Sequence, residues 1–133
     1  MMQKIIYTTL FVKDPQELLS WFPPKHANVF AHHVTIAFRP PTLEGVEVGK
    51  VLTLKILGRA TDEKGDALLV ERYKTHNAHP HITLSSAEGV PPAYSRELLE
   101  KAFENKTIEM VDEPYEVSLV EGFFDGEKDC LSP

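Results

Sequence analysis

The residues of this sequence best suited to chemistry form a short pattern that occurs twice, a histidine and a threonine separated by one apolar residue. The first copy is His33-Val34-Thr35-Ile36 and the second is His81-Ile82-Thr83-Leu84. Two histidines can share acid-base work, because an imidazole with a pKa of about 6.5 is present in both protonation states near neutral pH. A threonine hydroxyl can donate a hydrogen bond to an oxygen on which negative charge develops. Together these groups suit the cleavage of a phosphodiester, in which one histidine takes a proton from the nucleophile and the other gives one to the leaving group.

Each copy lies in a segment whose residues are typical of a β-strand, so we expect strands over residues 29–38 and 79–86. Successive side chains of a strand point to opposite faces, which places the histidine and the threonine of each copy on one face and its apolar residues on the other. On the first strand, this alternation predicts Phe30 and His32 on the packing face and Ala31 on the face of the histidine and threonine pair. Two such strands, each burying its apolar face, could form the walls of one site.

The rest of the sequence predicts a scaffold of strands and hairpins with two helices. Asp14 as N-cap and Glu17 three residues later indicate a short helix that ends before Pro23-Pro24. Apolar residues at helical spacing predict a longer helix over 93–103. Further strands are expected at 4–12, 49–59, 67–71, 107–111 and, after a turn at 112–114, at 115–124. This pattern predicts an α+β domain built mainly on antiparallel sheet.

Length and composition indicate one globular domain over residues 1–133, with 42% hydrophobic and 26% charged residues. No apolar run approaches the roughly 20 residues of a membrane-spanning helix, and the N-terminus lacks the features of a signal peptide. The single cysteine, Cys130, excludes an intrachain disulfide and is compatible with a reducing compartment. We expect a cytoplasmic protein with no membrane association that acts as a monomer.

Charge is distributed unevenly along the chain. The net charge of −6 argues against a protein that coats nucleic acid through clustered Lys and Arg. Residues 21–84, which contain both histidine patterns, carry eight basic and six acidic residues, whereas residues 85–133 carry four basic and twelve acidic ones. An anionic substrate is therefore expected at the first of these segments, with Arg39 and Lys74 as candidate phosphate-binding residues and Tyr73 as a candidate platform for a base.

The paired His-Val-Thr-Ile and His-Ile-Thr-Leu segments resemble the two H-x-T motifs of the 2H phosphoesterase superfamily, which includes RNA cyclic phosphodiesterases and 2′-5′ RNA ligase-like proteins. The stretch from His79 to Leu84 is also similar to the cyclic phosphodiesterase part of fungal and plant tRNA ligases. The resemblance implies a bilobed α+β fold whose motif strands face each other across a central cleft. It also implies metal-free chemistry at phosphodiesters, often at 2′,3′-cyclic phosphate ends. By match to the motifs, it assigns the catalytic roles to His33, Thr35, His81 and Thr83.

These observations predict a metal-independent cyclic phosphodiesterase without a cofactor, whose substrate is a 2′,3′-cyclic phosphate RNA end or a small cyclic nucleotide. The main alternative is a module of the same fold that binds a nucleotide or an RNA end without turnover. A second alternative is a small metal-binding β protein with His76, His79 and His81 as ligands, since His79 and His81 share a strand face. The lack of a nearby cysteine, and of Asp or Glu between Asn77 and Ser86, weighs against this metal site.

Overall fold

The computed structural model describes residues 5–38, 45–75 and 78–131, which form two helices and eight strands. The strands are β1 (Tyr7–Val12), β2 (Asn28–Val29), β3 (His33–Phe38), β4 (Val51–Thr61), β5 (Gly65–Val70), β6 (His81–Ser86), β7 (Glu109–Phe124) and β8 (Asp129–Cys130). The helices are α1 (Pro15–Trp21) and α2 (Tyr94–Asn105). Helix α1 begins where its sequence predicts, because the Asp14 side chain accepts a hydrogen bond from the Glu17 backbone N–H.

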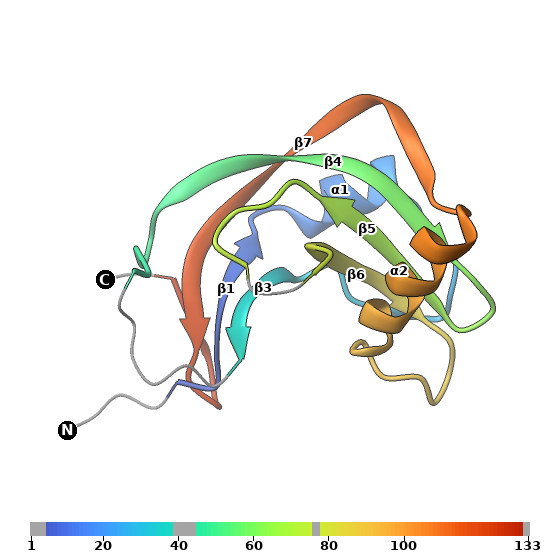
Figure 1. The fold of residues 1–133 in the computed structure, drawn as a ribbon. Helices are drawn as coiled ribbons and strands as arrows, with labels where there is room; N and C mark the ends of the chain where they lie inside the picture. The colour runs from blue at the N-terminus through green and yellow to red at the C-terminus, as the bar shows by residue number, and fades with distance from the viewer. Residues whose placement is uncertain (1–4, 39–44, 76–77, 132–133) are drawn as a thin grey trace.

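The eight strands of the described residues form one sheet in which every pairing is antiparallel. The strand order is β2-β6-β5-β4-β7-β1-β3, and β8 pairs with the end of β7. The long strands β4 and β7 arch across the molecule, with β1 and β3 at one end of the arch and β5 and β6 at the other (Figure 1). This architecture confirms the predicted α+β class, built mainly on antiparallel sheet with two helices.

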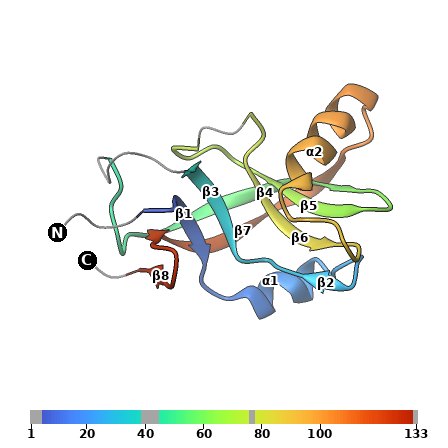
Figure 2. The ribbon, with the colours of Figure 1, turned by 90° about the horizontal axis from the view of Figure 1, so that it is seen from below.

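The curvature of the sheet brings strands together that are far apart in the strand order. β3 lies at one end of this order and β6 is next to last at the other, so β3 and β6 are not hydrogen-bonded neighbours in the described part of the chain. They nevertheless contact each other, and Figure 2 shows them next to one another when the molecule is seen from below. Helix α2 packs on β5 and β4, and in Figure 2 β6 lies between β3 and α2. The concave side of the sheet is therefore bordered by β3 on one side and by β6 and α2 on the other.

The strand predicted over residues 29–38 is interrupted, and this corrects the predicted faces of its first residues. Ala31 has a left-handed backbone with a φ of 62° and is fully buried, which breaks the alternation between β2 and β3. Before the break, the N–H groups of Phe30 and Ala31 donate to carbonyls of β6, and after it β3 pairs with β1. Phe30 and His32 therefore line the same pocket as His33 instead of the packing face, while Ala31 belongs to the core.

β7 is one strand where the sequence predicts two. The prediction of a turn at Asp112-Glu113-Pro114 is wrong, because the backbone remains extended there and the strand continues. The register between β4 and β7 changes from Ile56 opposite Tyr115 to Gly58 opposite Met110, so the extra residues of β7 form an irregularity within the ladder. A residue before proline favours extended backbone, and a bulge accommodates the missing N–H of proline, which explains why the chain does not reverse.

The buried apolar residues form two clusters on the two faces of β5. Leu68 and Val70 belong to the larger cluster, together with residues of α1, β1, β3, β4, β6 and β7. Ala67 and Leu69, which alternate with them, pack with α2 in the smaller one. Gly65 lets α2 approach closely, since a Cβ at this position would lie 2.8 Å from the Tyr94 ring. This packing holds the first turn of α2 beside β6.

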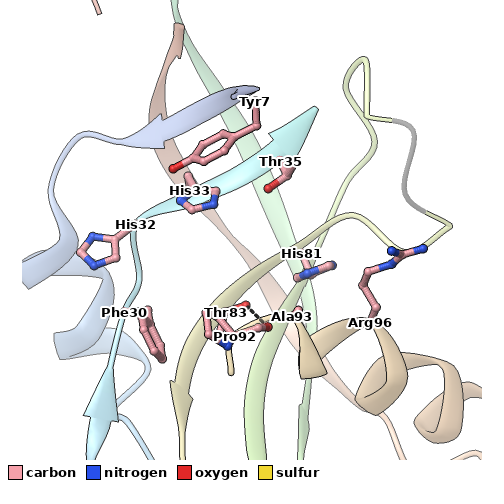
Figure 3. Close-up of a pocket in the computed structure, with 10 residues that line it drawn as sticks. All are labelled: Tyr7, Phe30, His32, His33, Thr35, His81, Thr83, Pro92, Ala93 and Arg96. Carbon is pink, nitrogen blue, oxygen red and sulfur yellow. Dashed lines mark hydrogen bonds between the residues drawn. The ribbon is translucent and has the colours of Figure 1, made fainter. Parts of the chain in front are cut away.

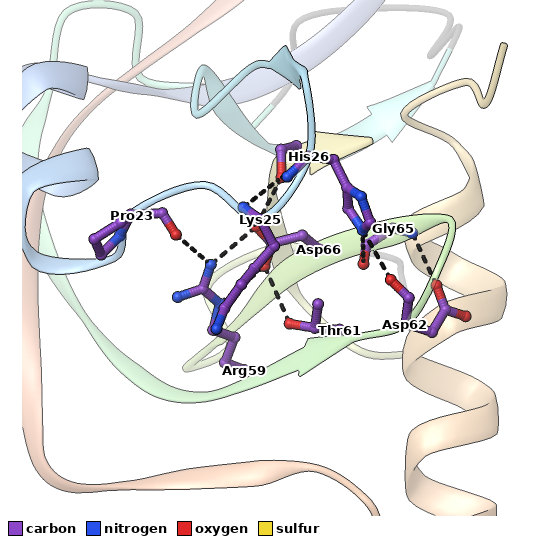
Figure 4. Close-up of polar contacts among 9 residues, drawn as sticks. Pro23, Lys25, His26, Arg59, Thr61, Asp62, Gly65 and Asp66 are labelled. Atoms are coloured by element: carbon purple, nitrogen blue, oxygen red, sulfur yellow. Dashed lines mark hydrogen bonds and ion pairs between the residues drawn. The ribbon is translucent and has the colours of Figure 1, made fainter. Parts of the chain in front are cut away.

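A buried ion pair joins the β4–β5 hairpin to the segment after α1 (Figure 4). Arg59 contacts Asp66 through two hydrogen bonds, Nε to Oδ1 at 2.8 Å and Nη2 to Oδ2 at 2.9 Å, and also donates to the Pro23 carbonyl at 2.6 Å. Asp66 is fully buried and accepts further hydrogen bonds from the Lys25 N–H and the Ser85 hydroxyl. This Asp66 network, formed by Pro23, Lys25, Arg59, Asp66 and Ser85, fixes the chain after α1 against β5 and β6 before it enters β2.

Candidate active site

A pocket of about 510 Å³ lies between β3 and β6 (Figure 3). Its walls come from β1, β3, β6, the first turn of α2 and the segment between β2 and β3. The volume is typical of sites that bind small molecules and nucleotides. The pocket therefore has the size and the position to hold a ligand between the two strands that carry the histidine patterns.

The structure brings the four candidate catalytic residues into this one pocket. β3 supplies His33 and Thr35, and β6 supplies His81 and Thr83. In each strand the two side chains share a face because one residue separates them. β3 and β6 are not neighbours in the sheet, and its curvature brings them to two different walls of the pocket. The two imidazoles can therefore approach a single group from different sides (Figure 3).

A backbone hydrogen bond orients the ring of His81. Its Nδ1 lies 2.8 Å from the His79 carbonyl oxygen and, since a carbonyl only accepts, Nδ1 donates its proton in this bond. Nε2 is then the ring nitrogen that can exchange a proton with a ligand. Burial lowers the pKa of His81 below its usual value, the hydrogen bond to His79 opposes this shift, and the positive charge of Arg96 adds to it.

The ring of His33 is held by stacking. It packs on Tyr7 with ring centroids 5.0 Å apart and 22° between the ring planes. None of the residues that the structure describes forms a hydrogen bond with this ring. Burial lowers the pKa of His33 to about 4, and the nearby His32 and His81 contribute in the same direction. In the free protein near neutral pH, His33 is therefore a neutral imidazole that can accept a proton.

The two threonine hydroxyls of the pocket differ in their partners. Thr83 Oγ1 lies 2.8 Å from the Ser95 hydroxyl and 3.3 Å from the Pro92 carbonyl oxygen, both in or next to the first turn of α2. Since a carbonyl only accepts, Thr83 donates its proton to Pro92 and its oxygen accepts from the buried Ser95, so a ligand oxygen can replace the Pro92 carbonyl as the acceptor. Thr35 lines the opposite wall, and no described residue forms a hydrogen bond with its hydroxyl.

Tyr73 and Lys74, expected to bind substrate, are not brought to this pocket. The Tyr73 hydroxyl donates to Glu121 Oε1 at 2.8 Å, and the Lys74 ammonium lies 3.0 Å from Glu121 Oε2. Because Glu121 is fully buried on β7, these contacts compensate a buried charge and give both residues a structural role. Arg39, the third candidate for substrate binding, lies outside the described residues.

The sequence does not predict the pocket positions of Tyr7, Phe30, His32 and Arg96, which the structure brings to the two histidines. Phe30 and His32 are displaced from the expected face by the left-handed backbone of Ala31, a conformation that an alanine does not signal. Arg96 falls in the first turn of the expected helix, but only the packing of α2 on β5 places this turn beside β6.

Metal-ligating side chains are scattered over the fold. Within residues 5–38, 45–75 and 78–131, no group of three or more His, Cys, Asp or Glu is placed to hold a metal ion. Of the histidines in the metal-binding alternative, His76 lies outside the described residues, and the ring of His79 stacks on Phe103 with centroids 4.3 Å apart. Neither of the two described helices is long and apolar enough to cross a membrane.

The motifs and the geometry of the pocket are two separate observations on this chain. Two H-x-T patterns are short, and their placement in a single pocket is an observation independent of sequence similarity. The sequence matches none of the models of known protein families, and a search of curated proteins finds no match either.

Proposed function

We propose that this protein is a metal-independent phosphodiesterase of the 2H type, which hydrolyses the 2′,3′-cyclic phosphate of an RNA end or of a small nucleotide. The observation that carries the proposal is that His33, Thr35, His81 and Thr83, from two strands that are not sheet neighbours, line one pocket. The proposal includes the bilobed arrangement and central cleft that the family resemblance implies. It also includes action in the cytoplasm as a monomer without a cofactor.

The chemistry requires one histidine in each protonation state. His33, neutral and without a described hydrogen-bond partner, acts as the general base and takes a proton from the attacking water. His81, in its protonated form, acts as the general acid through Nε2, and the hydrogen bond from Nδ1 to the His79 carbonyl opposes the lowering of its pKa by burial. As the new P–O bond to water forms, the bond from phosphorus to the leaving ribose oxygen breaks, and this oxygen receives the proton of His81. Exchange of protons with solvent restores both histidines.

The threonine hydroxyls support this reaction as hydrogen-bond donors. Negative charge grows on the non-bridging phosphate oxygens in the transition state, and a positioned donor stabilises it more than it stabilises the ground state. Thr35 and Thr83 line opposite walls of the pocket, so each can reach one of these oxygens. The hydrogen bond between Thr83 and Ser95 holds the Thr83 hydroxyl in place.

The experiment is an assay of the purified full chain with a nucleoside 2′,3′-cyclic phosphate and identification of the monophosphate formed. His33→Ala and His81→Ala are each expected to reduce turnover by roughly 10²- to 10⁴-fold without unfolding the protein. His26→Ala is the matched control, since it also removes an imidazole but from outside the pocket. Turnover is expected to persist after exhaustive treatment with EDTA and not to increase when zinc is added.

Two results would contradict the proposal. A folded His81→Ala variant with unchanged turnover would remove His81 from the mechanism. Turnover that disappears with EDTA and returns with added metal would indicate a metal-activated water. Tight binding of the substrate by the wild-type protein without any turnover would favour the alternative, a module that binds nucleotides or RNA ends.

A further inference from the structure

The pocket that holds the two histidines has chemically different ends. At one end lie Phe30 and His32, whose rings meet edge to face with centroids 6.4 Å apart. At the other end lies Arg96, in the first turn of α2. Figure 3 shows His33 and His81 between these ends. A ligand whose phosphate lies between the histidines can therefore extend toward an aromatic group on one side and toward a cation on the other.

Arg96 is an exposed cation without an ion-pair partner among the residues that the structure describes. Glu100, one helical turn further along α2, forms no ion pair with it, whereas Lys101 on the same helix lies 3.9 Å from Glu97. A guanidinium is positively charged and presents several N–H donors in one plane. An unpaired guanidinium at the edge of a pocket is therefore well suited to bind a phosphate through two hydrogen bonds.

The surroundings of Arg96 leave room for such a phosphate. Arg96 lines both the histidine pocket and a smaller adjoining hollow of about 220 Å³, which His79 and Glu100 also line. The first N–H groups of α2, at residues 94–96, already donate to the carbonyls of residues 91–93. The guanidinium, and not the helix N-terminus, is thus the donor available to an anion at this end of the pocket.

The opposite end of the pocket offers a place for a planar aromatic group. Tyr7 already stacks on His33 and on Phe124, with centroid distances of 5.0 and 5.3 Å, so its ring is covered. Phe30 is half-buried and His32 is exposed, and both line the pocket. Every nucleobase has a flat face that can stack on such rings.

We propose that the site prefers nucleotides with a second phosphate at the 5′ position, with the base against Phe30 and His32, the cyclic phosphate between the histidines and the 5′ phosphate on Arg96. This inference rests on the proposed phosphodiesterase function and names its substrate class. The geometry of ribose fits the two different ends of the pocket, because the base on C1′ and the 5′ group on C4′ lie at opposite ends of the 2′,3′ edge. The 5′ phosphate can belong to a free nucleotide or to the last linkage of an RNA chain.

The test compares kcat/KM for adenosine 2′,3′-cyclic phosphate with that for the same compound carrying a 5′-phosphate and for a dinucleotide ending in the cyclic phosphate. Since a hydrogen bond between charged groups is strong, we expect the 5′-phosphate to increase kcat/KM by roughly 10-fold or more. In Arg96→Gln this preference should fall to about 2-fold or less. An equal gain with the dinucleotide indicates an RNA end, whereas a gain only with the free 5′-phosphate indicates a mononucleotide.

Two variants of α2 serve as controls for charge. Lys101→Gln removes a positive charge of the same helix outside the pocket, and it should leave the preference unchanged. Glu100→Gln removes a negative charge from the hollow that Arg96 lines, and it should increase the preference. If the wild-type protein shows no preference, or if Arg96→Gln retains it, the inference is wrong while the phosphodiesterase function stands.

A binding measurement keeps the two proposals separate. Calorimetry compares adenosine 3′-monophosphate with adenosine 3′,5′-bisphosphate, neither of which can be hydrolysed as a cyclic phosphate. Tighter binding of the bisphosphate by the wild-type protein, lost in Arg96→Gln, supports the second-phosphate site even if no cyclic phosphate is turned over. Equal binding of both compounds, or equal preference in the variant, contradicts it.

Discussion

The two histidines of the pocket differ in what holds their rings, and the proposed mechanism assigns their roles from this difference. His81 donates from Nδ1 to the His79 carbonyl, a bond that is stronger when the ring carries a positive charge. His33 stacks on Tyr7 and has a pKa lowered to about 4, mainly by burial. The pKa of His81 is also lowered by burial, but its hydrogen bond to His79 opposes this shift, so the two environments suit His33 to act as the base and His81 as the acid in the proposed mechanism.

This division predicts the pH dependence of kcat/KM. In the proposed mechanism the active form has neutral His33 and protonated His81, so activity should fall below about pH 4, where His33 gains a proton, and above the pKa of His81. Because burial and the charge of Arg96 hold the pKa of His81 below its usual value, the alkaline limb should lie below pH 6.5. The measurement is a pH profile with adenosine 2′,3′-cyclic phosphate. In Arg96→Gln the alkaline limb should move to higher pH.

The leaving group provides an independent check of the same assignment. A variant without its general acid should recover much of its rate on a p-nitrophenyl phosphodiester, whose leaving group needs no proton, whereas a variant without its base should not. We therefore expect rescue of His81→Ala and not of His33→Ala. Rescue of His33→Ala alone would reverse the two roles.

The hydroxyl of Thr83 yields a second prediction at this scale. Thr83→Val keeps the branched shape and removes the donor, so kcat should fall roughly 10²-fold or more, while Thr83→Ser should lose less. Ser95→Ala should lower kcat by about 10-fold, because it removes the 2.8 Å hydrogen bond that holds the Thr83 hydroxyl in place, and Ser95→Thr should restore it. Steady-state kinetics measure these effects, with Thr53→Val on the outer part of β4 as control. Equal damage from valine and serine at position 83 would indicate packing instead of hydrogen bonding.

At the scale of elements, the site depends on the segment that runs from α1 to β3. The Asp66 network holds the start of this segment, and the buried, left-handed Ala31 holds its end. Between them, the chain pairs with β6 and then passes to β1. This crossing carries Phe30 and His32 into the pocket and sets where β3 begins.

The Asp66 network predicts a large effect on stability. Asp66→Asn leaves the guanidinium of Arg59 buried without its counter-charge, since only 12% of this side chain is exposed. The free energy of unfolding should therefore fall by about 3–5 kcal/mol. Urea unfolding at pH 7 measures this loss, and the control is Asp112→Asn, whose side chain is exposed on β7. A change of less than about 1 kcal/mol in Asp66→Asn would show that the ion pair is not a main support of this segment.

At the scale of the whole molecule, the partly buried histidines of the pocket link stability to pH. Unfolded His33 has its ordinary pKa of about 6.5, whereas folded His33 has a pKa of about 4, so between these values the unfolded chain binds more protons. Stability should therefore fall as pH decreases through this window, by about 2–3 kcal/mol from pH 7 to 4.5. The lowered pKa of His81 acts in the same direction.

The measurement is urea unfolding at pH 7 and at pH 4.5 for the wild-type protein and for His33→Asn. The asparagine does not titrate, so the variant should lose about 2 kcal/mol less stability between the two values than the wild-type protein. The same loss in both proteins would assign the acid sensitivity to other groups. Both pH values lie above the ordinary pKa values of most carboxyl groups, which limits the contribution of these groups to the change in stability.

The sequence alone determined much of the local structure. Alternation along each strand places His33 with Thr35 and His81 with Thr83, because side-chain direction in a strand depends only on neighbouring residues. The N-cap of α1, the helical spacing in α2 and the antiparallel α+β class also follow from local patterns. The local pattern predicted a turn at Asp112-Glu113-Pro114, and this prediction is wrong. Pairing with β4, which is distant in the sequence, keeps these residues within β7.

Only the tertiary structure decided which residues share the pocket. Arg96 and Ser95 reach it because α2 packs on β5, and Phe30 and His32 reach it because the backbone turns at Ala31. Tyr73 and Lys74, close to His81 in the sequence, instead compensate the buried charge of Glu121. These placements depend on the curvature of the sheet and on pairings between distant segments, whose energies arise only when the whole core forms. For this reason the two motifs predict four candidate catalytic residues, whereas the residues that surround them in the pocket depend on the fold.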